Sequence, residues 1–448
     1  MSSKWHVMGA AVALVVTSAS LAWAQAAPVT LSLEDAIARG QKTAPRIAEA
    51  AARQEAAGAT LDARQALKLP SVTATGAYQR TSPVDPFGIT LPTGQSLSLY
   101  QDIPNNYRLR GDATMPLYTS GRTEALIAAA TLDTKAATAE ARATTADVAL
   151  DVARAYWALV TAREQVKVVE QGLARIDAYV NDVKARVNTG FLPPNDLLSA
   201  QAQRSRQAVA LIQAKNGAAI AQADLCRLVG LDLDTPITTS SALMTPDATA
   251  TQLLTKPIAA LTEQARGGRA EREALTLRAD SARQSGEAAA AAVKPVVGVA
   301  GGIEESRPNP RVFPRADEWH LTWELGVSVS WNLFDGGKAK ADRAAATAQA
   351  TALERRRDDF DAALGVELRQ RRMDVEAGKA ALEASAEGVA AATEARRVVE
   401  ERFKAGVSTN TEVLDAQTAL LEAELQRTQL AAQLRLSEAR LLRAVGGR

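Results

Sequence analysis

The stretch RVNTGFLPPNDLLSAQ, residues 186–201, has a counterpart later in the chain, RFKAGVSTNTEVLDAQ at residues 402–417. Gly190 corresponds to Gly406, which lies 216 positions further on (406 − 190), and both stretches end in Ala-Gln. In each, the glycine follows helix-forming residues, and a Pro-Pro or Thr-x-x-Glu sequence comes soon after it. These signals end one helix and begin the next. The sequence therefore predicts the same helix–turn–helix at two places.

The similarity continues on both sides of the turn. At the same offset, residues 115–230 align with residues 331–446 without a gap. A solenoid unit would recur every roughly 20–50 residues, so this repeat is far too long to be one. It indicates a duplicated half-protein, with a first structural repeat at 25–230, a second at 261–448 and a connector at 231–260.

Composition excludes several classes of function. The 448 residues carry a net charge of +1 with both signs interspersed, so no basic face for nucleic acid is predicted. Cys226 is the single cysteine and corresponds to Leu442 in the repeat, which favours a small buried hydrophobic residue over a reactive thiol. The two histidines, His6 and His320, form no metal-ligand pattern. No metal and no cofactor are predicted.

The N-terminus has the pattern of an export signal. Lys4 precedes an apolar run, and Ala22-Trp23-Ala24 is the small-x-small pattern of signal peptidase cleavage. The apolar run is short for a membrane-spanning helix. We expect residues 1–24 to be a signal peptide that is cut after Ala24, so the mature protein is exported.

Two long segments favour continuous helix. Residues 122–187 and 338–405 contain no proline and are rich in Ala, Glu, Arg, Gln and Leu. Each would span roughly 100 Å at about 1.5 Å per residue. Shorter helices are predicted after each turn, so that each half forms a long antiparallel helical hairpin, at about 122–229 and 338–446. Sparse apolar residues such as Val148, Val152 and Leu159 indicate a coiled-coil seam.

Strands are predicted before each long helix, in hairpins at about 70–117 and 295–333. In WHLTWELGVSVSW, residues 319–331, apolar and polar residues alternate strictly. A half-buried sheet in a soluble domain would alternate too. Export, a length near the roughly 9–11 residues of a spanning strand, and aromatic residues near the strand ends favour a membrane sheet. The predicted membrane-interface aromatics are Tyr107, Trp319, Trp323 and Trp331.

Such a sheet cannot stand alone in lipid, because open strand edges leave backbone groups without hydrogen bonds. Four strands in each chain must close with other chains. Three copies give 12 strands (4 × 3), an even number that is typical of outer-membrane barrels.

These features together resemble the TolC family of outer-membrane efflux channels. The resemblance rests on LSLEDAIARGQKTAPRI at 31–47, PLYTSGR at 116–122, LFDGGK at 333–338 and the two turn stretches, and it covers essentially the whole mature chain. It implies a mixed all-α plus membrane β-barrel fold. In that fold, a homotrimer forms a 12-stranded outer-membrane barrel that continues into a 12-helix periplasmic coiled-coil barrel.

The resemblance also implies function and partners. Family members conduct drugs, other small toxic compounds, metal ions or secreted proteins outward, together with a periplasmic adaptor and an inner-membrane pump, and they catalyse no reaction. The family's gate carboxylates correspond to Glu412 and Asp415, which we expect in the first turn of the last helix. In a trimer they would give six carboxylates (2 × 3) in a constriction that favours cations. Thr409 and Glu412 also have the spacing of a capping box.

The turns are the expected contact with the adaptor. The residues assigned to this role are Gly190, Phe191, Leu192, Asp196, Gly406, Val407 and Ser408. At two positions the chain departs from the family. Ser408 and Phe403 stand where the best-studied member has an arginine and a tyrosine that hold the second tip closed. The contacts that hold the closed state must therefore differ or be weaker, and the sequence does not reveal which.

Other classes fit less well. An adaptor has one helical hairpin beside lipoyl-like and β-barrel domains, and a purely structural coiled coil would lack the alternating strands. VGVAGG, residues 297–302, is glycine-rich but lies in a predicted strand with no following helix, so it is not a dinucleotide site. Within transport, the sequence leaves open small-molecule efflux or type I protein secretion, and it names neither substrate nor pump.

Overall fold

The structure is a computed structural model that describes residues 29–85 and 87–447. The predicted signal peptide and its cleavage site after Ala24 lie outside the described residues. The helices are α1 (Leu33–Thr43), α2 (Pro45–Gln65), α3 (Arg122–Asn188), α4 (Pro194–Val229), α5 (Ala248–Leu254), α6 (Ile258–Gly268), α7 (Ala270–Ala290), α8 (Lys338–Lys404) and α9 (Asn410–Ala444). The strands are β1 (Val29–Leu31), β2 (Ser71–Arg80), β3 (Phe87–Thr90), β4 (Ser96–Tyr100), β5 (Asn105–Tyr118), β6 (Ile237–Thr239), β7 (Val296–Arg307) and β8 (His320–Ser330).

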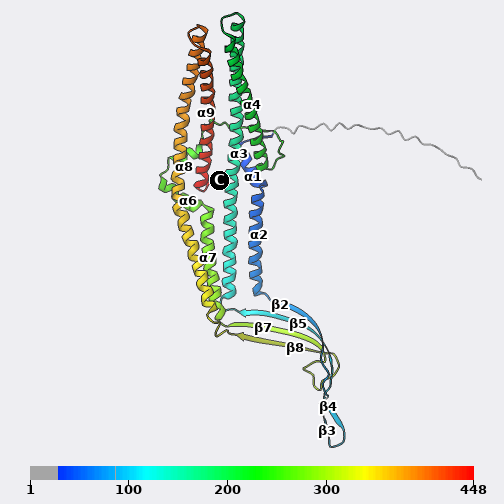
Figure 1. Ribbon diagram of the computed structural model, residues 1–448. Helices are drawn as coiled ribbons and strands as arrows, with labels where there is room; N and C mark the ends of the chain where they lie inside the picture. The colour runs from blue at the N-terminus through cyan, green and yellow to red at the C-terminus, as the bar shows by residue number, and fades with distance from the viewer. Residues whose placement is uncertain (1–28, 86, 448) are drawn as a thin grey trace, which may run out of the picture.

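The molecule is elongated, with helices at one end and strands at the other (Figure 1). The hairpins α3–α4 and α8–α9 run side by side, and their two tips lie together at the end far from the strands. The long helices α3 and α8 have 67 residues each. At about 1.5 Å per residue each spans roughly 100 Å, as the composition predicted. Among the described residues, no helix combines the length and the apolar character that a membrane crossing requires.

The main helical core lies halfway along the hairpins. There α3 packs against α1 and α4, and Val152, Tyr156, Leu159 and Leu225 are buried between them. Cys226 is fully buried in the same cluster, as predicted, and burial raises the pKa of its thiol. Many of the other buried residues of α3 are alanines. Small side chains let neighbouring helices approach closely, which suits a seam between long helices better than a thick core.

The four long strands form one antiparallel sheet in the order β2-β5-β7-β8. Both outer strands, β2 and β8, have an unpaired edge in the single chain. The odd-numbered residues of β8 make one apolar face, on which Leu321, Trp323 and Leu325 are each about 70% exposed (69%, 73% and 72%). A continuous apolar surface of this kind marks contact with lipid or protein rather than with water.

Three short features were not predicted. Between β2 and β5, β3 and β4 pair as a small hairpin that extends beyond the sheet (Figure 1). The connector 231–260 contains β6, α5 and the start of α6. Strand β6 pairs in parallel with β1, more than 200 positions earlier, and no local sequence pattern reports such a contact.

Candidate functional site

The two hairpin tips share one turn geometry. Gly190 and Gly406 both adopt the left-handed conformation, with φ of 79° and 76°. In the first tip the Phe191 amide donates to the Arg186 carbonyl (2.9 Å), and in the second the Val407 amide donates to the Arg402 carbonyl (2.9 Å). This is a hydrogen-bonded helix end that glycine permits without steric strain. The structure therefore places the two predicted turns where the repeat indicated.

The helices that leave the tips begin differently. Helix α4 begins at Pro194, which fixes the backbone for a helix start. At α9 the Thr409 hydroxyl accepts a hydrogen bond from the Glu412 amide (3.3 Å), which is one half of the predicted capping box. The Glu412 carboxylate accepts a hydrogen bond from the Ser408 hydroxyl, and this bond lowers the pKa of Glu412.

Glu412 and Asp415 are both exposed on α9. Glu412 lies in the first turn of the helix, as predicted. Asp415 lies in the second turn, because the helix begins at Asn410, and this corrects the expectation that both would be in the first turn. Side chains three residues apart share one helical face, so the two carboxylates still project from the same side of α9.

The apolar tip residues differ in exposure. Phe191 is 83% exposed and Val407 is 64% exposed, at corresponding positions of the two turns. Leu192 is half-buried against a small core between the hairpins, and Asp196 lies above that core at the start of α4. Each tip thus presents one protruding apolar side chain on a turn whose base is fixed by packing.

A buried hydrogen bond joins the two hairpins below the tips. The Tyr179 hydroxyl on α3 donates to Asn410 Oδ1 on α9 (2.6 Å), and Asn410 Nδ2 donates to the Asp196 carbonyl (3.3 Å). Both side chains are buried, and burial is the main cause that raises the pKa of Tyr179. Asn410 therefore bridges three helices, α3, α4 and α9.

Phe403 completes this junction. Its ring centroid lies 5.7 Å from that of Tyr179, and the Arg186 guanidinium lies 5.5 Å from its centroid. Sequence reasoning noted Phe403 only as a departure and missed Tyr179 and Asn410. A signal did exist, since the repeat has Ala395 and Pro194 at their corresponding positions. A polar residue that is present in only one of the two repeats can indicate a contact between the two hairpins of the chain.

The contact between the hairpins continues away from the tips. Arg175 on α3 pairs with Glu424 on α9 (2.7 Å), and both side chains are mostly buried. Gln203 on α4 donates to the Thr418 hydroxyl on α9 (3.0 Å). These polar contacts and the apolar core at the tips hold α9 against α3 and α4.

The predicted interface aromatics lie at different depths in the sheet. Tyr107 and Trp319 lie together at the end far from the helices, with ring centroids 6.0 Å apart. Trp331 lies at the helical end, where its indole donates to the Val293 carbonyl (3.0 Å). Trp323 is opposite Ile303 within the paired part of the sheet, so it lies deeper than either end.

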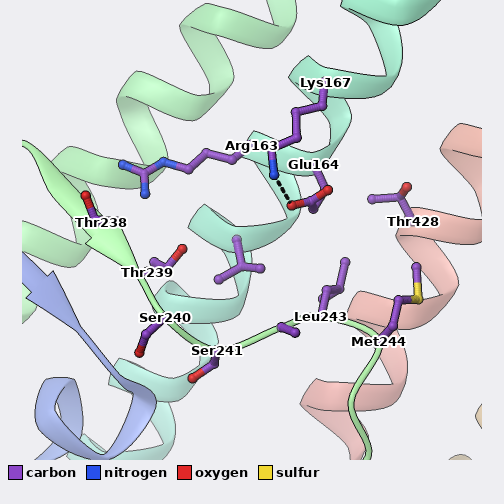
Figure 2. Close-up of a pocket in the computed structure, with 12 residues that line it drawn as sticks. Arg163, Glu164, Lys167, Thr238, Thr239, Ser240, Ser241, Leu243, Met244 and Thr428 are labelled. Carbon is purple, nitrogen blue, oxygen red and sulfur yellow. Dashed lines mark hydrogen bonds and ion pairs between the residues drawn. The ribbon is translucent and has the colours of Figure 1, made fainter.

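A cavity of about 500 Å³ lies where the connector crosses α3 and α9 (Figure 2). Arg163 extends to β6, where it donates to the Ile237 carbonyl, while Lys167 pairs with Glu164 (2.6 Å). Hydroxyl groups of residues 238–241 line the rest. The Arg163 hydrogen bond holds this part of the connector against α3.

A sheet with open edges and an exposed apolar face, joined to long hairpins with exposed tips, fits a protein whose sheet lies in a membrane. The chain belongs to the outer membrane efflux protein family, whose model matches residues 37–231 and 261–447. This confirms the predicted TolC-like membership and the predicted location in the outer membrane. Members of the family are channels rather than enzymes.

Individual relatives agree with this assignment. Protein CyaE of Bordetella pertussis is 27% identical over 359 residues, which cover 79% of this chain and 73% of that protein. The outer membrane protein VceC of Vibrio cholerae has the same fold, with a TM-score of 0.76 at 19% identity, covering 93% of this chain and 96% of that one. The CmeC outer membrane channel of Campylobacter jejuni matches with a TM-score of 0.76 at 14% identity, covering 93% and 85%.

Proposed function

We propose that this protein is the exit duct of a tripartite efflux pump. It would passively conduct small toxic compounds from a periplasmic adaptor and an inner-membrane pump to the exterior. The observation that carries the proposal is the four-stranded sheet with two open edges, on a chain of the outer membrane efflux family. In lipid those edges need partners, and further copies of the same sheet supply them.

Three copies would close a barrel of 12 strands (4 × 3), an even number that suits the outer membrane. The helices would continue the same ring into the periplasm as a 12-helix barrel. Exposed apolar residues on the outer helices support contacts between copies. On α4 these are Leu198, Val209, Ile212 and Ile220, and on α8 they are Val366 and Met373.

The internal duplication is part of the proposal. Helices α2 and α7 both have 21 residues, and α3 and α8 both have 67. The two family matches, at 37–231 and 261–447, fall one in each proposed repeat. A duplicated hairpin explains how one chain supplies two similar tips with a pseudo-symmetric arrangement.

The tips are the proposed entrance. Glu412 and Asp415 would line a constriction of six carboxylates in the trimer, which would favour cations. The adaptor would contact both turns, through Gly190, Phe191, Leu192, Asp196, Gly406, Val407 and Ser408. Support comes from the exposure of Phe191 and Val407 on turns with fixed bases. The Tyr179–Asn410 hydrogen bond would hold the entrance closed in place of the family's arginine and tyrosine contacts.

The same duct geometry would also serve type I protein secretion, so the test must separate the two cargoes. The gene is deleted, and sensitivity to a panel of small toxic compounds is compared with the set of proteins in the culture medium. Efflux predicts increased sensitivity that the wild-type gene reverses. Unchanged sensitivity together with the loss of a secreted protein would contradict the efflux proposal and favour secretion.

A further inference from the structure

A cluster of charged side chains lies on the polar face of the sheet. Arg110 on β5 is at its centre, with its Nε 2.8 and 2.9 Å from the Asp112 carboxylate oxygens. Its Nη1 donates to Glu304 on β7 (3.2 Å), and its Nη2 donates to Glu324 on β8. Arg108 also pairs with Glu304 (3.5 Å). One guanidinium therefore connects three neighbouring strands.

The loop between β7 and β8, residues 308–319, folds back over this cluster. Arg311 donates to the Trp323 carbonyl (3.0 Å) and to the Glu324 carboxylate. Asn309 is 1% exposed and donates to the His320 carbonyl (2.8 Å). On the other side, Arg315 donates to Asn106 on β5 (2.8 Å). The loop thus crosses from β8 to β5 along the polar face.

A glycine makes room for the cluster. Gly302 lies between Asp112 and Glu324 in the register of the sheet. A Cβ atom added there would be 2.8 Å from Asp112 Oδ1 and 3.3 Å from Arg110 Nη2. This contact accounts for the last glycine of the glycine-rich stretch 297–302. A side chain at this position would displace the Asp112 carboxylate and the Arg110 guanidinium from the places they occupy.

The strand alternation fixes which way the cluster faces. Leu321, Trp323 and Leu325 lie on the opposite face and are exposed. Guanidinium groups on a lipid-facing surface are destabilising, so in a closed barrel the apolar face meets lipid and the charged face meets the lumen. All four strands join the helices at one end of the sheet, so loop 308–319 lies at the opposite, outward end (Figure 1).

We propose that loop 308–319 and the charged cluster beneath it form a second constriction, at the outward end of the channel, which sets the selectivity of the exit. The inference rests on the proposed function. Within the hydrogen-bonded cluster, each chain contributes three carboxylates, Asp112, Glu304 and Glu324, and three arginines, Arg108, Arg110 and Arg311. The cluster is therefore balanced in charge, unlike the proposed acidic ring at the tips, so removing one of its charges should change the ion selectivity of the exit.

Two substitutions shift this balance in opposite directions. Glu324→Gln removes a carboxylate from each chain, so the channel should shift towards anions. Arg311→Ala removes an arginine and frees the loop, so the channel should shift towards cations, and its conductance should rise by about twofold as the constriction widens. Ion selectivity and conductance are measured in planar bilayers. Glu287→Gln is the matched control, because the Glu287–Arg343 pair (2.8 Å) joins helices α7 and α8 outside the sheet.

Neighbouring cysteines test the two faces directly. Glu324→Cys should react with a charged, water-soluble methanethiosulfonate reagent, and its conductance should fall on modification. Leu325→Cys, on the lipid face, should not respond. The wild-type chain serves as a blank, since its single cysteine, Cys226, is fully buried.

The outcomes separate this inference from the function on which it rests. A wild-type protein that forms no channel in bilayers would contradict the proposed duct itself. A conducting wild type whose Glu324→Gln and Arg311→Ala variants keep its selectivity and conductance would overturn the second constriction alone. If Glu324→Gln fails to assemble, Arg311→Ala still decides the question, because Arg311 is half exposed on a loop and is not needed for strand pairing.

Discussion

At the scale of single residues, the buried hydrogen bond between Tyr179 and Asn410 is the contact that we propose holds the entrance closed. Phe403 keeps the aromatic ring but has no hydroxyl, and the Tyr179 hydroxyl reaches Asn410 instead. Removing one partner of a buried hydrogen bond costs more than the bond itself contributes, because the other partner stays unsatisfied. Loss of the Tyr179 hydroxyl oxygen alone should therefore weaken the contact between α3 and α9.

We therefore expect Tyr179→Phe to loosen the closed entrance. The substitution keeps the ring against Phe403 but leaves Asn410 Oδ1 without its donor, at a cost of about 1–3 kcal/mol to the closed junction. Single-channel conductance should rise, and trimer assembly should be unchanged. Tyr118→Phe, at an exposed tyrosine of β5, is the control. Equal conductance in both variants would show that the hydrogen bond does not hold the entrance.

The turn glycines give a second residue-scale prediction. Gly190→Val and Gly406→Val place a β-branched side chain at φ of 79° and 76°, which strains the backbone by about 1–3 kcal/mol although the space around each Cβ is open. Efflux in a complemented deletion strain should fall while the trimer persists. Gly217→Val, in α4 with open space and ordinary φ, should be silent. Full efflux in both turn variants would argue against adaptor contact there.

The Glu412 carboxylate gives a pH prediction. Its hydrogen bond from Ser408 lowers its pKa, so it remains charged in more acidic solution than an ordinary glutamate. If cation preference depends on Glu412, it should persist as the pH falls. It should be lost only at a pH below the ordinary pKa of a glutamate side chain. Ser408→Ala removes the bond, so the loss should move to higher pH. Reversal potentials measured across a pH series check this. Identical pH profiles for the wild type and Ser408→Ala would show that Glu412 does not determine ion selectivity.

At the scale of elements, the sequence predicted the parts with strong local signals. Helices α3 and α8 begin at Arg122 and Lys338, as predicted, because Gly121 and Gly337 precede them in left-handed conformations. Strand β7 was predicted to end near Ile303 but continues to Arg307. Its last residues are polar, and they stay in the sheet through pairing with β5 and β8, which no local pattern reports.

The site was less predictable than the fold for the same reason. The turns and the exposed carboxylates are local features, and the repeat located them. The Tyr179–Asn410 bond joins residues 231 positions apart, and the Arg110 cluster joins three strands. Both depend on how distant elements pack. The connector's β6 and the β3–β4 hairpin were missed because their strands are only three to five residues long.

Helix α9 also contains a buried ion pair beneath the connector. Arg435 and Glu438 are 2.7 Å apart with both side chains 2% exposed, and Arg435 also donates to the Thr245 carbonyl (2.6 Å). We expect Glu438→Ala to cost about 3–5 kcal/mol, because it leaves a buried, unpaired arginine. The double change Arg435→Met/Glu438→Leu should cost much less. Thermal unfolding of the two variants tests this. Equal losses of stability would show that the unpaired charge of Arg435 is not the cause of the destabilisation.

At the scale of the whole molecule, the four-stranded sheet of one chain cannot close into a barrel by itself. The edges of its sheet are open, one face of the sheet is apolar, and the other face carries charges that lipid would not accept. In the proposed ring, the tips at one end and the charged cluster at the other would be the two ends of one conduit. Every functional proposal here depends on closure of that ring by further copies.

The most direct test is therefore the number of chains in the assembly. The protein is extracted from outer membranes in mild detergent, and its mass is measured by native mass spectrometry and by chemical cross-linking. Closure of four-stranded sheets into one barrel predicts three chains, with no stable monomer outside detergent. A monodisperse, water-soluble monomer that lacks the signal peptide would contradict the account.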